Sequence, residues 1–177
     1  MKRFLLPLLF FALVIPMFVV ALSKDPTALP STFLGKAAPA FELPQLQDQS
    51  QTVTKDNFAR QDILVNFWAT WCVGCRQEHQ FLLQLAANNT IPVYGINWRD
   101  QRSEALRWLA TLGDPYTLSA FDGENHAGID WGVYAAPETF LIDGSGTVVY
   151  KHLGPLNRRV WQQEFVPRLS DASGATK

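Results

Sequence analysis

Two cysteines, Cys72 and Cys75, are the only thiols in the 177-residue chain, and the dipeptide Val73-Gly74 separates them. An apolar run, Ile63–Trp68, precedes the pair, and a helix-like run begins at Arg76. A helix that starts at Cys72 would place this sulfur beside backbone N–H groups without intrahelical partners, at the positive end of the helix dipole. Such a setting lowers the pKa of a thiol and favours the thiolate, which is the nucleophile.

The spacing of the two cysteines suits thiol–disulfide exchange. Cys75 lies three residues after Cys72 and therefore on the same helix face, where it can resolve a mixed disulfide formed at Cys72. A structural bridge closing so short a loop would constrain the unfolded chain little. A structural zinc site needs four ligands, and the histidines, His79, His126 and His152, are scattered. We therefore expect redox chemistry and no metal site.

Length and charge limit the other possibilities. The chain is long enough for one ordinary domain with appendages. Its formal net charge is −1, and no basic cluster follows residue 3. The electrostatic footprint of a nucleic-acid binder is therefore missing.

The amino terminus has the pattern of a membrane anchor. Phe4–Leu22 is uncharged and almost wholly apolar, about the 20 residues that span a bilayer core. Lys2 and Arg3 precede it, which leaves the start in the cytoplasm and the rest in the periplasm of a bacterial cell. We expect residues 1–22 to form a single-pass inner-membrane anchor and residues 23–34 a tether. The alternative is a cleaved signal peptide, since Val19-Val20-Ala21 offers a cleavage site.

Strand and helix patterns alternate through the rest of the chain, which predicts an α/β domain over residues 35–170 and a disordered tail over 171–177. Ile63–Trp68 is apolar throughout, as in a strand covered on both faces of a mixed central sheet flanked by helices. Ala38–Pro44 is expected as an edge segment or as a short hairpin with Gln51–Val53. The other expected strands lie in Ile91–Trp98, Thr117–Phe121, Glu138–Asp143 and Thr147–Lys151. Three helices are expected: from the cysteines to Asn88, over Ala105–Leu112, and over Arg158–Leu169 after Asn157. The second is opened by Ser103 and Glu104 and capped by Gly113, and its apolar side consists of Leu106, Leu109 and Leu112.

Three segments carry a family resemblance: Asn66–Cys72, Cys75–His79 and Gly132–Gly144. They resemble the thiol:disulfide interchange proteins of cytochrome c maturation, the DsbE/CcmG type. The similarity runs from about Gly35 to Leu169 and includes the membrane anchor. It implies a thioredoxin-like fold and no bound cofactor beyond a redox-active disulfide.

The resemblance also implies roles for individual residues. Cys72 would be the attacking thiol and Cys75 the resolving one. Pro137 would follow a cis peptide bond, which proline makes accessible. The backbone of Ala136 would then face the disulfide and pair with an extended substrate segment.

Two carboxylates, Glu78 and Glu138, are expected near the thiols, where negative charge raises thiol pKa values. For Glu78 an ordinary solvated helix position is the alternative. Thioredoxins carry an acidic residue where this chain has Asn66, and an amide cannot accept the proton that the resolving thiol loses; Glu78, Glu138 or solvent would take that role.

The tryptophans and histidines are assigned more simply. Trp68, Trp71 and Trp98 could line a substrate groove, but tryptophans are more often large packing residues, and only Trp71, adjacent to Cys72, is expected to contact substrate. His79 and His126 are expected on the surface or in loops.

The sequence therefore predicts a membrane-anchored periplasmic protein-disulfide reductase. The resemblance implies apocytochrome c, or a thiol carrier serving it, as the client and a membrane dithiol carrier as the electron donor. Two alternatives remain: a general disulfide oxidant or isomerase, and a thioredoxin-fold copper chaperone, for which His152 is the only late candidate for a third ligand.

Overall fold

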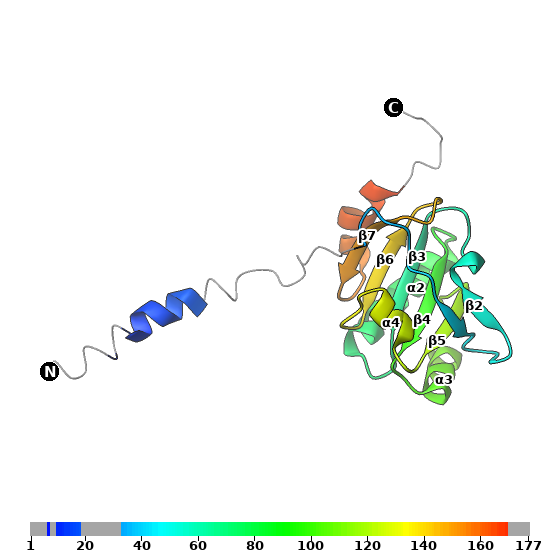
Figure 1. The fold of residues 1–177 in the computed structure, drawn as a ribbon, viewed down its shortest axis with the longest axis horizontal. Coiled ribbons are helices and arrows are strands. Elements are labelled where there is room, and N and C mark those ends of the chain that lie inside the picture. The colour runs from blue at the N-terminus through cyan, green and yellow to red at the C-terminus, as the bar shows by residue number, and fades with distance from the viewer. Residues whose placement is uncertain (1–6, 8–9, 19–32, 170–177) are drawn as a thin grey trace, which may run out of the picture. The chain divides into compact units, whose positions relative to one another are not determined.

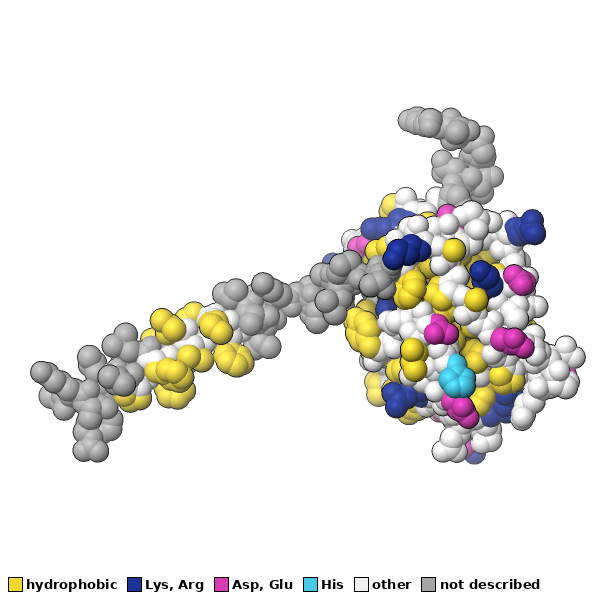
Figure 2. All heavy atoms as spheres, viewed as in Figure 1, with side chains coloured by type: hydrophobic (Ala, Val, Ile, Leu, Met, Phe, Trp, Pro, Cys, Tyr) yellow, Lys and Arg dark blue, Asp and Glu magenta, His cyan; other side chains and the backbone are white. Residues whose placement is uncertain are grey.

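The computed structural model describes residues 7, 10–18 and 33–169. The chain divides into two units, Met1–Pro30 and Ser31–Lys177, which are considered separately. In the first, residues 10–18 are helical, and apolar side chains such as Phe10 and Leu13 are exposed (Figure 2). No helix within the described ranges is both long enough and apolar enough to cross a bilayer. The predicted anchor and tether extend over residues outside these ranges, and the predicted tail lies wholly outside them.

The second unit contains the predicted mixed sheet. Its strand order is β5-β4-β3-β6-β7, with β3, β4 and β5 parallel and β6 and β7 antiparallel to their neighbours (Figure 1). The bounds are close to those expected from sequence: β3 Ile63–Trp68, β4 Val93–Trp98, β5 Leu118–Asp122, β6 Glu138–Ile142 and β7 Val148–Leu153.

The central strand β3 is buried along its whole length because both faces of the sheet are covered. Successive strand residues point to opposite faces. Val65 and Phe67 belong to one apolar core, together with Trp131. Leu64 belongs to a second core on the opposite face. This two-sided burial explains the near-continuous apolar run in the sequence.

The sheet is covered by α2 Val73–Ala87, α3 Arg102–Leu112 and α4 His126–Asp130, and by the C-terminal helical segment, whose Trp161 and Phe165 belong to the second core. Figure 1 shows α4 in front of the sheet and α2 behind it. The start of α2 and the buried face of α3 share a third apolar core. The short α4 was not expected from sequence.

Helix α3 differs from its prediction in two details. Gln101, not Ser103, precedes the helix as its N-cap, and it makes no side-chain cap hydrogen bond. The buried residues are Ala105, Trp108 and Leu109, whereas Leu106 and Leu112 are only partly buried. Gly113 caps the C-terminus with a φ of 94°, as expected.

The last helical segment is broken into short pieces. Asn157 accepts a hydrogen bond from the backbone N–H of Val160, as predicted for a cap. The single helix expected over 158–169 is divided into an α-helical turn, a π-helical turn and a 3-10 turn: α5 Arg158–Val160, η3 Trp161–Phe165 and η4 Val166–Arg168. Pro167, which lacks a backbone N–H, cannot continue the α-helical hydrogen bonding.

Segments before β3 pair with part of each edge strand of the sheet. The predicted hairpin forms from β1 Glu42–Pro44 and β2 Thr52–Thr54, followed by the 3-10 turn η2 Lys55–Asn57. The backbone N–H of Leu46 donates to Ser119 in β5 at 2.8 Å, and that of Ala38 donates to Gly146, before β7, at 2.9 Å. These contacts shorten the stretch of each edge that could pair with another strand.

Candidate active site

Cys72 and Cys75 form a disulfide at the start of α2, with their Cα atoms 5.3 Å apart. Cys72 is the N-cap residue, and its Sγ accepts a hydrogen bond from the backbone N–H of Cys75 at 3.0 Å. The predicted placement at the helix start is confirmed. In the reduced protein the same N–H and the helix dipole favour a Cys72 thiolate. The two residues are only 5% and 3% exposed, so a client must approach closely along the surrounding surface.

A loop before β6 meets the cysteine pair. The Ala136–Pro137 peptide bond is cis, as the resemblance implied. Ala136 packs against the apolar core that contains both cysteines. A Cβ atom added to Gly74 would lie 2.8 Å from Cδ of Pro137 and 3.3 Å from Cγ of Pro155. The loop and the active-site helix therefore pack together at the position where this chain has glycine.

We expect Gly74→Ala to lower the free energy of unfolding of the oxidised protein by about 1 kcal/mol. The new Cβ meets a rigid proline ring, and overpacking of about 1–3 kcal/mol outweighs the helix-stabilising effect of alanine. Urea unfolding measures the change. Val73→Ala, at a position that is 74% exposed, is the matched control and should change stability little. A Gly74→Ala protein as stable as wild type would contradict the close packing.

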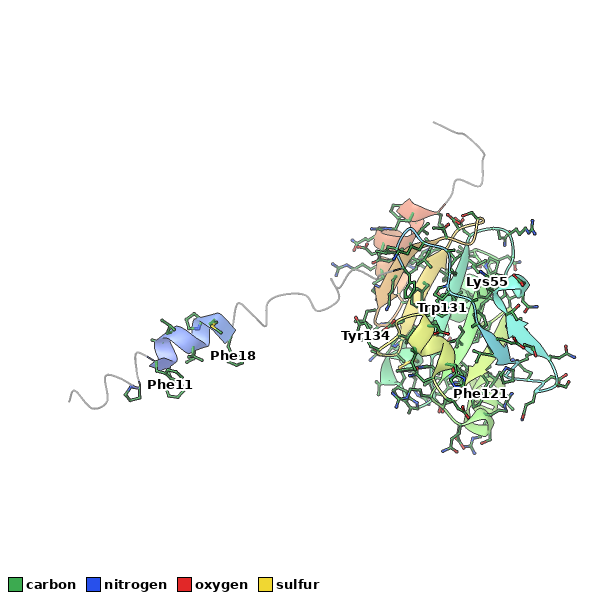
Figure 3. All side chains as sticks on the ribbon, in the orientation of Figure 1. Phe11, Phe18, Lys55, Phe121, Trp131 and Tyr134 are labelled. Carbon is green, nitrogen blue, oxygen red and sulfur yellow. A yellow bond between two sulfur atoms is a disulfide. The ribbon has the colours of Figure 1, made fainter. Side chains whose placement is uncertain are left out.

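Glu138 is fully buried at the start of β6 and holds this loop. Its Oε1 accepts hydrogen bonds from the backbone N–H groups of Tyr134 and Ala135 at 3.1 and 3.2 Å. Its Oε2 forms an ion pair with Nζ of Lys151 at 2.7 Å. The same ammonium group donates to the carbonyl oxygen of Gly132 at 2.9 Å. In Figure 3, Tyr134 lies at the margin of the domain, whereas Trp131 lies over the sheet.

The ion pair changes what is expected of Glu138. Lys151 offsets the carboxylate charge that would otherwise raise the Cys72 pKa. We expect Glu138→Gln to lower the Cys72 pKa only slightly, because the charge that it removes is already offset by Lys151. Thiolate absorbance of the reduced protein against pH measures this value. Lys151→Met, which leaves the Glu138 carboxylate uncompensated, should raise the Cys72 pKa. A larger change in the Cys72 pKa in Glu138→Gln than in Lys151→Met would show that the carboxylate acts on the thiol despite its ion pair.

Glu78 is buried in α2, which rules out the solvated alternative. Its Oε1 accepts a hydrogen bond from Nδ2 of Asn66 at 2.9 Å, and its Oε2 accepts one from the backbone N–H of Leu156 at 2.7 Å. Burial raises the pKa of Glu78 to about 8, although the hydrogen bonds from Leu156 and Asn66 act in the opposite direction. A carboxyl group with this pKa can take up or release a proton near neutral pH.

A buried polar network extends from Glu78 across β3. Asn66 accepts a hydrogen bond from the hydroxyl of Tyr116 at 2.9 Å and donates to Oγ1 of Thr139 at 3.0 Å. Burial, with smaller contributions from the charges of Glu78 and Asp114, raises the pKa of Tyr116 well above its ordinary value. Sequence reasoning missed Tyr116 and Thr139. The polar interruption at Asn66 was visible, but its partners come from distant segments.

The tryptophans divide as expected. Trp68 and Trp98 are buried, whereas Trp71 is 56% exposed. Its Nε1–H donates to the carbonyl oxygen of Arg99 at 3.0 Å, and its ring lies 5.9 Å from that of Trp98. Trp71 is thus an exposed aromatic side chain held beside Cys72.

The histidines differ from their predictions in one case. His79 is buried, and burial lowers its pKa, so its assignment to the surface is wrong. Nε1–H of Trp108 donates to its Nδ1, and its Nε2 lies 3.0 Å from the carbonyl oxygen of Gly113. His126 is exposed, as expected. His152 packs against Phe165 at 6.2 Å between ring centres. Within the described part of the chain, no three His, Cys, Asp or Glu side chains are grouped so that they could hold a metal ion.

Comparison with known proteins agrees with this site. The Redoxin family model matches residues 33–168. The thiol:disulfide interchange protein DsbE of Allochromatium vinosum is 46% identical over 173 residues, covering 98% of this chain and 96% of the relative. DsbE of Escherichia coli K12 is 46% identical over 172 residues, covering 94% and 92%. A crystal structure described as a DsbE protein of Chlorobium tepidum superposes with a TM-score of 0.63 at 28% identity, covering 77% of this chain and 96% of that one.

The family match and the disulfide at the helix start agree on the chemistry. The molecule is a thioredoxin-like protein-disulfide oxidoreductase whose redox-active disulfide is Cys72–Cys75. The chain belongs to the Redoxin family and, within it, to the DsbE thiol:disulfide interchange proteins.

Proposed function

We propose that this protein is a membrane-anchored periplasmic reductase for disulfides of apocytochrome c, or of a thiol carrier that serves it. The observation that carries the proposal is the arrangement at the start of α2. Cys72 caps the helix, and Glu78, buried and with its pKa raised to about 8, lies three residues beyond Cys75. This combination favours a nucleophilic thiolate and provides a proton acceptor for the resolving thiol.

The reaction transfers two electrons from the protein to its client. The Cys72 thiolate attacks one sulfur of a client disulfide, and the client's other sulfur leaves as a thiolate that takes up a proton. The Cys75 thiol gives its proton to Glu78 and attacks Sγ of Cys72. The client's second sulfur then leaves as a thiolate, which takes that proton from Glu78 and becomes a thiol, and the Cys72–Cys75 disulfide remains. The structure has this oxidised form.

Client docking is proposed at the backbone of Ala136. Ala136 is partly exposed beside the cysteine pair. Within residues 33–169, neither its N–H nor its C=O has a hydrogen-bond partner. Free backbone groups of this kind can pair with an extended segment whatever its side chains. This pairing would bring the client disulfide to Cys72.

A membrane-embedded dithiol carrier is proposed as the electron donor, because the bacterial periplasm is kept oxidising and offers no soluble pool of reductant. No bound cofactor is needed, since the cysteine pair carries both electrons. The exposed apolar side chains of residues 10–18 support an anchor over residues 1–22, which would hold the domain near such a carrier.

The proposal is tested by mixing the reduced protein with an oxidised peptide that carries the two cysteines and the histidine of a haem-attachment motif. When the reaction is complete, thiol counting is expected to show that each protein molecule has reduced one peptide disulfide. An equilibrium lying instead toward oxidised peptide would assign the protein to the oxidants. Tight one-to-one copper binding by the reduced protein, lost in His152→Ala, would support the copper chaperone.

A further inference from the structure

Trp71 is held rigidly although more than half of its surface is exposed. Its indole N–H is bonded to the carbonyl oxygen of Arg99, and its ring lies against Trp98. Arg99 adopts a φ of 49°, a left-handed conformation that is costly for a residue with a long side chain. A hydrogen bond from its N–H to the carbonyl oxygen of Asp122, 2.9 Å long, helps to maintain this conformation. A fixed, exposed aromatic ring beside a nucleophile has the properties of a binding anchor.

Two arginines lie on either side of this anchor. The guanidinium of Arg76 lies 4.3 Å from the ring centre of Trp108, and that of Arg99 lies 5.5 Å from the ring centre of Trp98. Across the described ranges, neither guanidinium has a carboxylate within ion-pair distance. Stacking on a ring face leaves the N–H edge of a guanidinium available to a carboxylate.

The acidic groups nearby are already engaged. Glu104 is paired with Arg107. Asp100 accepts hydrogen bonds from four donors: the N–H and Oγ1–H of Thr70 at 2.6 and 2.8 Å, Nδ2–H of Asn97 at 3.0 Å and the N–H of Gln101 at 2.8 Å. The donors to Asp100 are uncharged, so its negative charge remains. The walls around Trp71 nevertheless carry three arginines, Arg76, Arg99 and Arg107, against the two carboxylates Glu104 and Asp100, so their net charge is positive.

Two surface hollows adjoin Trp71. One hollow, about 370 Å³, is lined by Arg76, Trp108 and Leu112 among others. A second, about 410 Å³, is lined by Arg99, Asp100 and Gln101 among others. Both hollows include Thr70, Trp71 and Glu104 in their walls, so they adjoin each other at Trp71, the residue before Cys72. The two hollows together are called the groove below.

We propose that this groove binds an extended, acidic segment of the client polypeptide. Carboxylates of the segment pair with Arg76 and Arg99, and an apolar side chain packs on Trp71. The inference rests on the proposed reductase function and adds a charge preference to it: disulfides flanked by Asp or Glu are the preferred substrates.

The test uses two synthetic disulfide peptides. In the acidic peptide two Glu residues flank the attacked cysteine, and in the neutral peptide, otherwise identical, both are Gln. The full reduced protein is mixed with each peptide, and the rate of peptide reduction is followed at low salt. The acidic peptide is expected to react roughly fivefold faster. This ratio should approach one at 0.5 M salt and in the double variant Arg76→Gln/Arg99→Gln. A change in the Cys72 pKa cancels in the ratio, because both peptides meet the same thiol.

Arg158→Gln is the matched control, because it removes an arginine charge near the C-terminal half of α2, away from the groove. It should retain the fivefold ratio. Equal rates for the two peptides at low salt, or a ratio that the double variant leaves intact, would overturn the proposed docking surface. Reduction of a small uncharged disulfide by the wild-type protein separates failure of the docking proposal from failure of the reductase proposal. If this reaction also fails, the reductase function itself is wrong.

Discussion

Replacement of Cys75 by alanine is expected to convert the protein into a covalent trap for its clients. Cys72 would still attack a client disulfide, because its position as helix N-cap and the dipole of α2 are unchanged. The mixed disulfide would then persist, since no second thiol remains to resolve it. Turnover should fall by at least about a thousandfold, and mass spectrometry under non-reducing conditions should show a protein–client adduct.

Cys72→Ala is the matched control and should form no adduct while also losing turnover. Both cysteines are almost equally buried, so exposure alone does not assign their roles. Adducts formed by Cys72→Ala and not by Cys75→Ala would reverse the assignment. Normal turnover in Cys75→Ala would contradict a resolving role altogether.

Glu78→Gln is expected to slow the resolving step by roughly 100-fold or more at pH 7, because a positioned acid–base group contributes about 10²–10⁴-fold. The glutamine side chain would fill the same space but could not accept the proton of Cys75. Rapid mixing with a disulfide peptide should therefore show the mixed disulfide forming at nearly the wild-type rate and decaying slowly. A variant in which both steps keep wild-type rates would show that solvent takes the proton.

The same substitution has a second consequence, in the pH dependence of stability. The pKa of Glu78 rises from an ordinary 4.5 to about 8 on folding, so between these values the folded protein binds more protons than the unfolded chain. The free energy of unfolding therefore falls as pH rises from 4.5 through 8, by about 3–5 kcal/mol from this group. Glu78→Gln should lack that fall when oxidised protein is unfolded in urea at pH 5 and pH 9.

Glu42→Gln serves as the control for this slope, because Glu42 is an exposed residue at the start of β1, away from Glu78. It should keep the wild-type fall in stability. Glu78→Gln also destabilises the protein by placing an amide N–H₂ against the backbone N–H of Leu156. This loss is the same at both pH values, so it cancels when the changes in stability between pH 5 and pH 9 are compared. Parallel profiles for wild type and Glu78→Gln would mean that Glu78 is not the group that titrates.

Local patterns predicted the frame of the active site well. The continuous apolar run of β3, the CxxC pair at a helix start and the β6–β7 hairpin are each encoded within a few neighbouring residues. The ion pair of Glu138 was not predicted from the sequence, although the register of the β6–β7 hairpin could have indicated it. This register places Glu138 opposite Leu153, so Lys151 lies diagonally across on the same face, within reach of a long side chain.

Contacts between distant segments were not predictable in this way. Glu78 has the sequence context of a surface residue, and it is buried because Leu156, 78 positions later, closes over it. His79 is buried for a similar reason, by Trp108 of α3 and the carbonyl of Gly113. Tyr116 lies in a loop and gives no local indication that it reaches Asn66. Helical periodicity indicates which residues share a face, but not which tertiary partner covers that face.

The central claim is that the Cys72–Cys75 pair donates electrons to client disulfides, and its reduction potential tests this most directly. The domain is equilibrated with thiol redox buffers, and the dithiol and disulfide forms are quantified. We expect a potential well below the roughly −120 mV of a strong periplasmic oxidant, in the range of about −180 mV or lower that characterises weaker oxidants and reductants. A value near −120 mV would contradict the reductase account and assign the protein to disulfide formation.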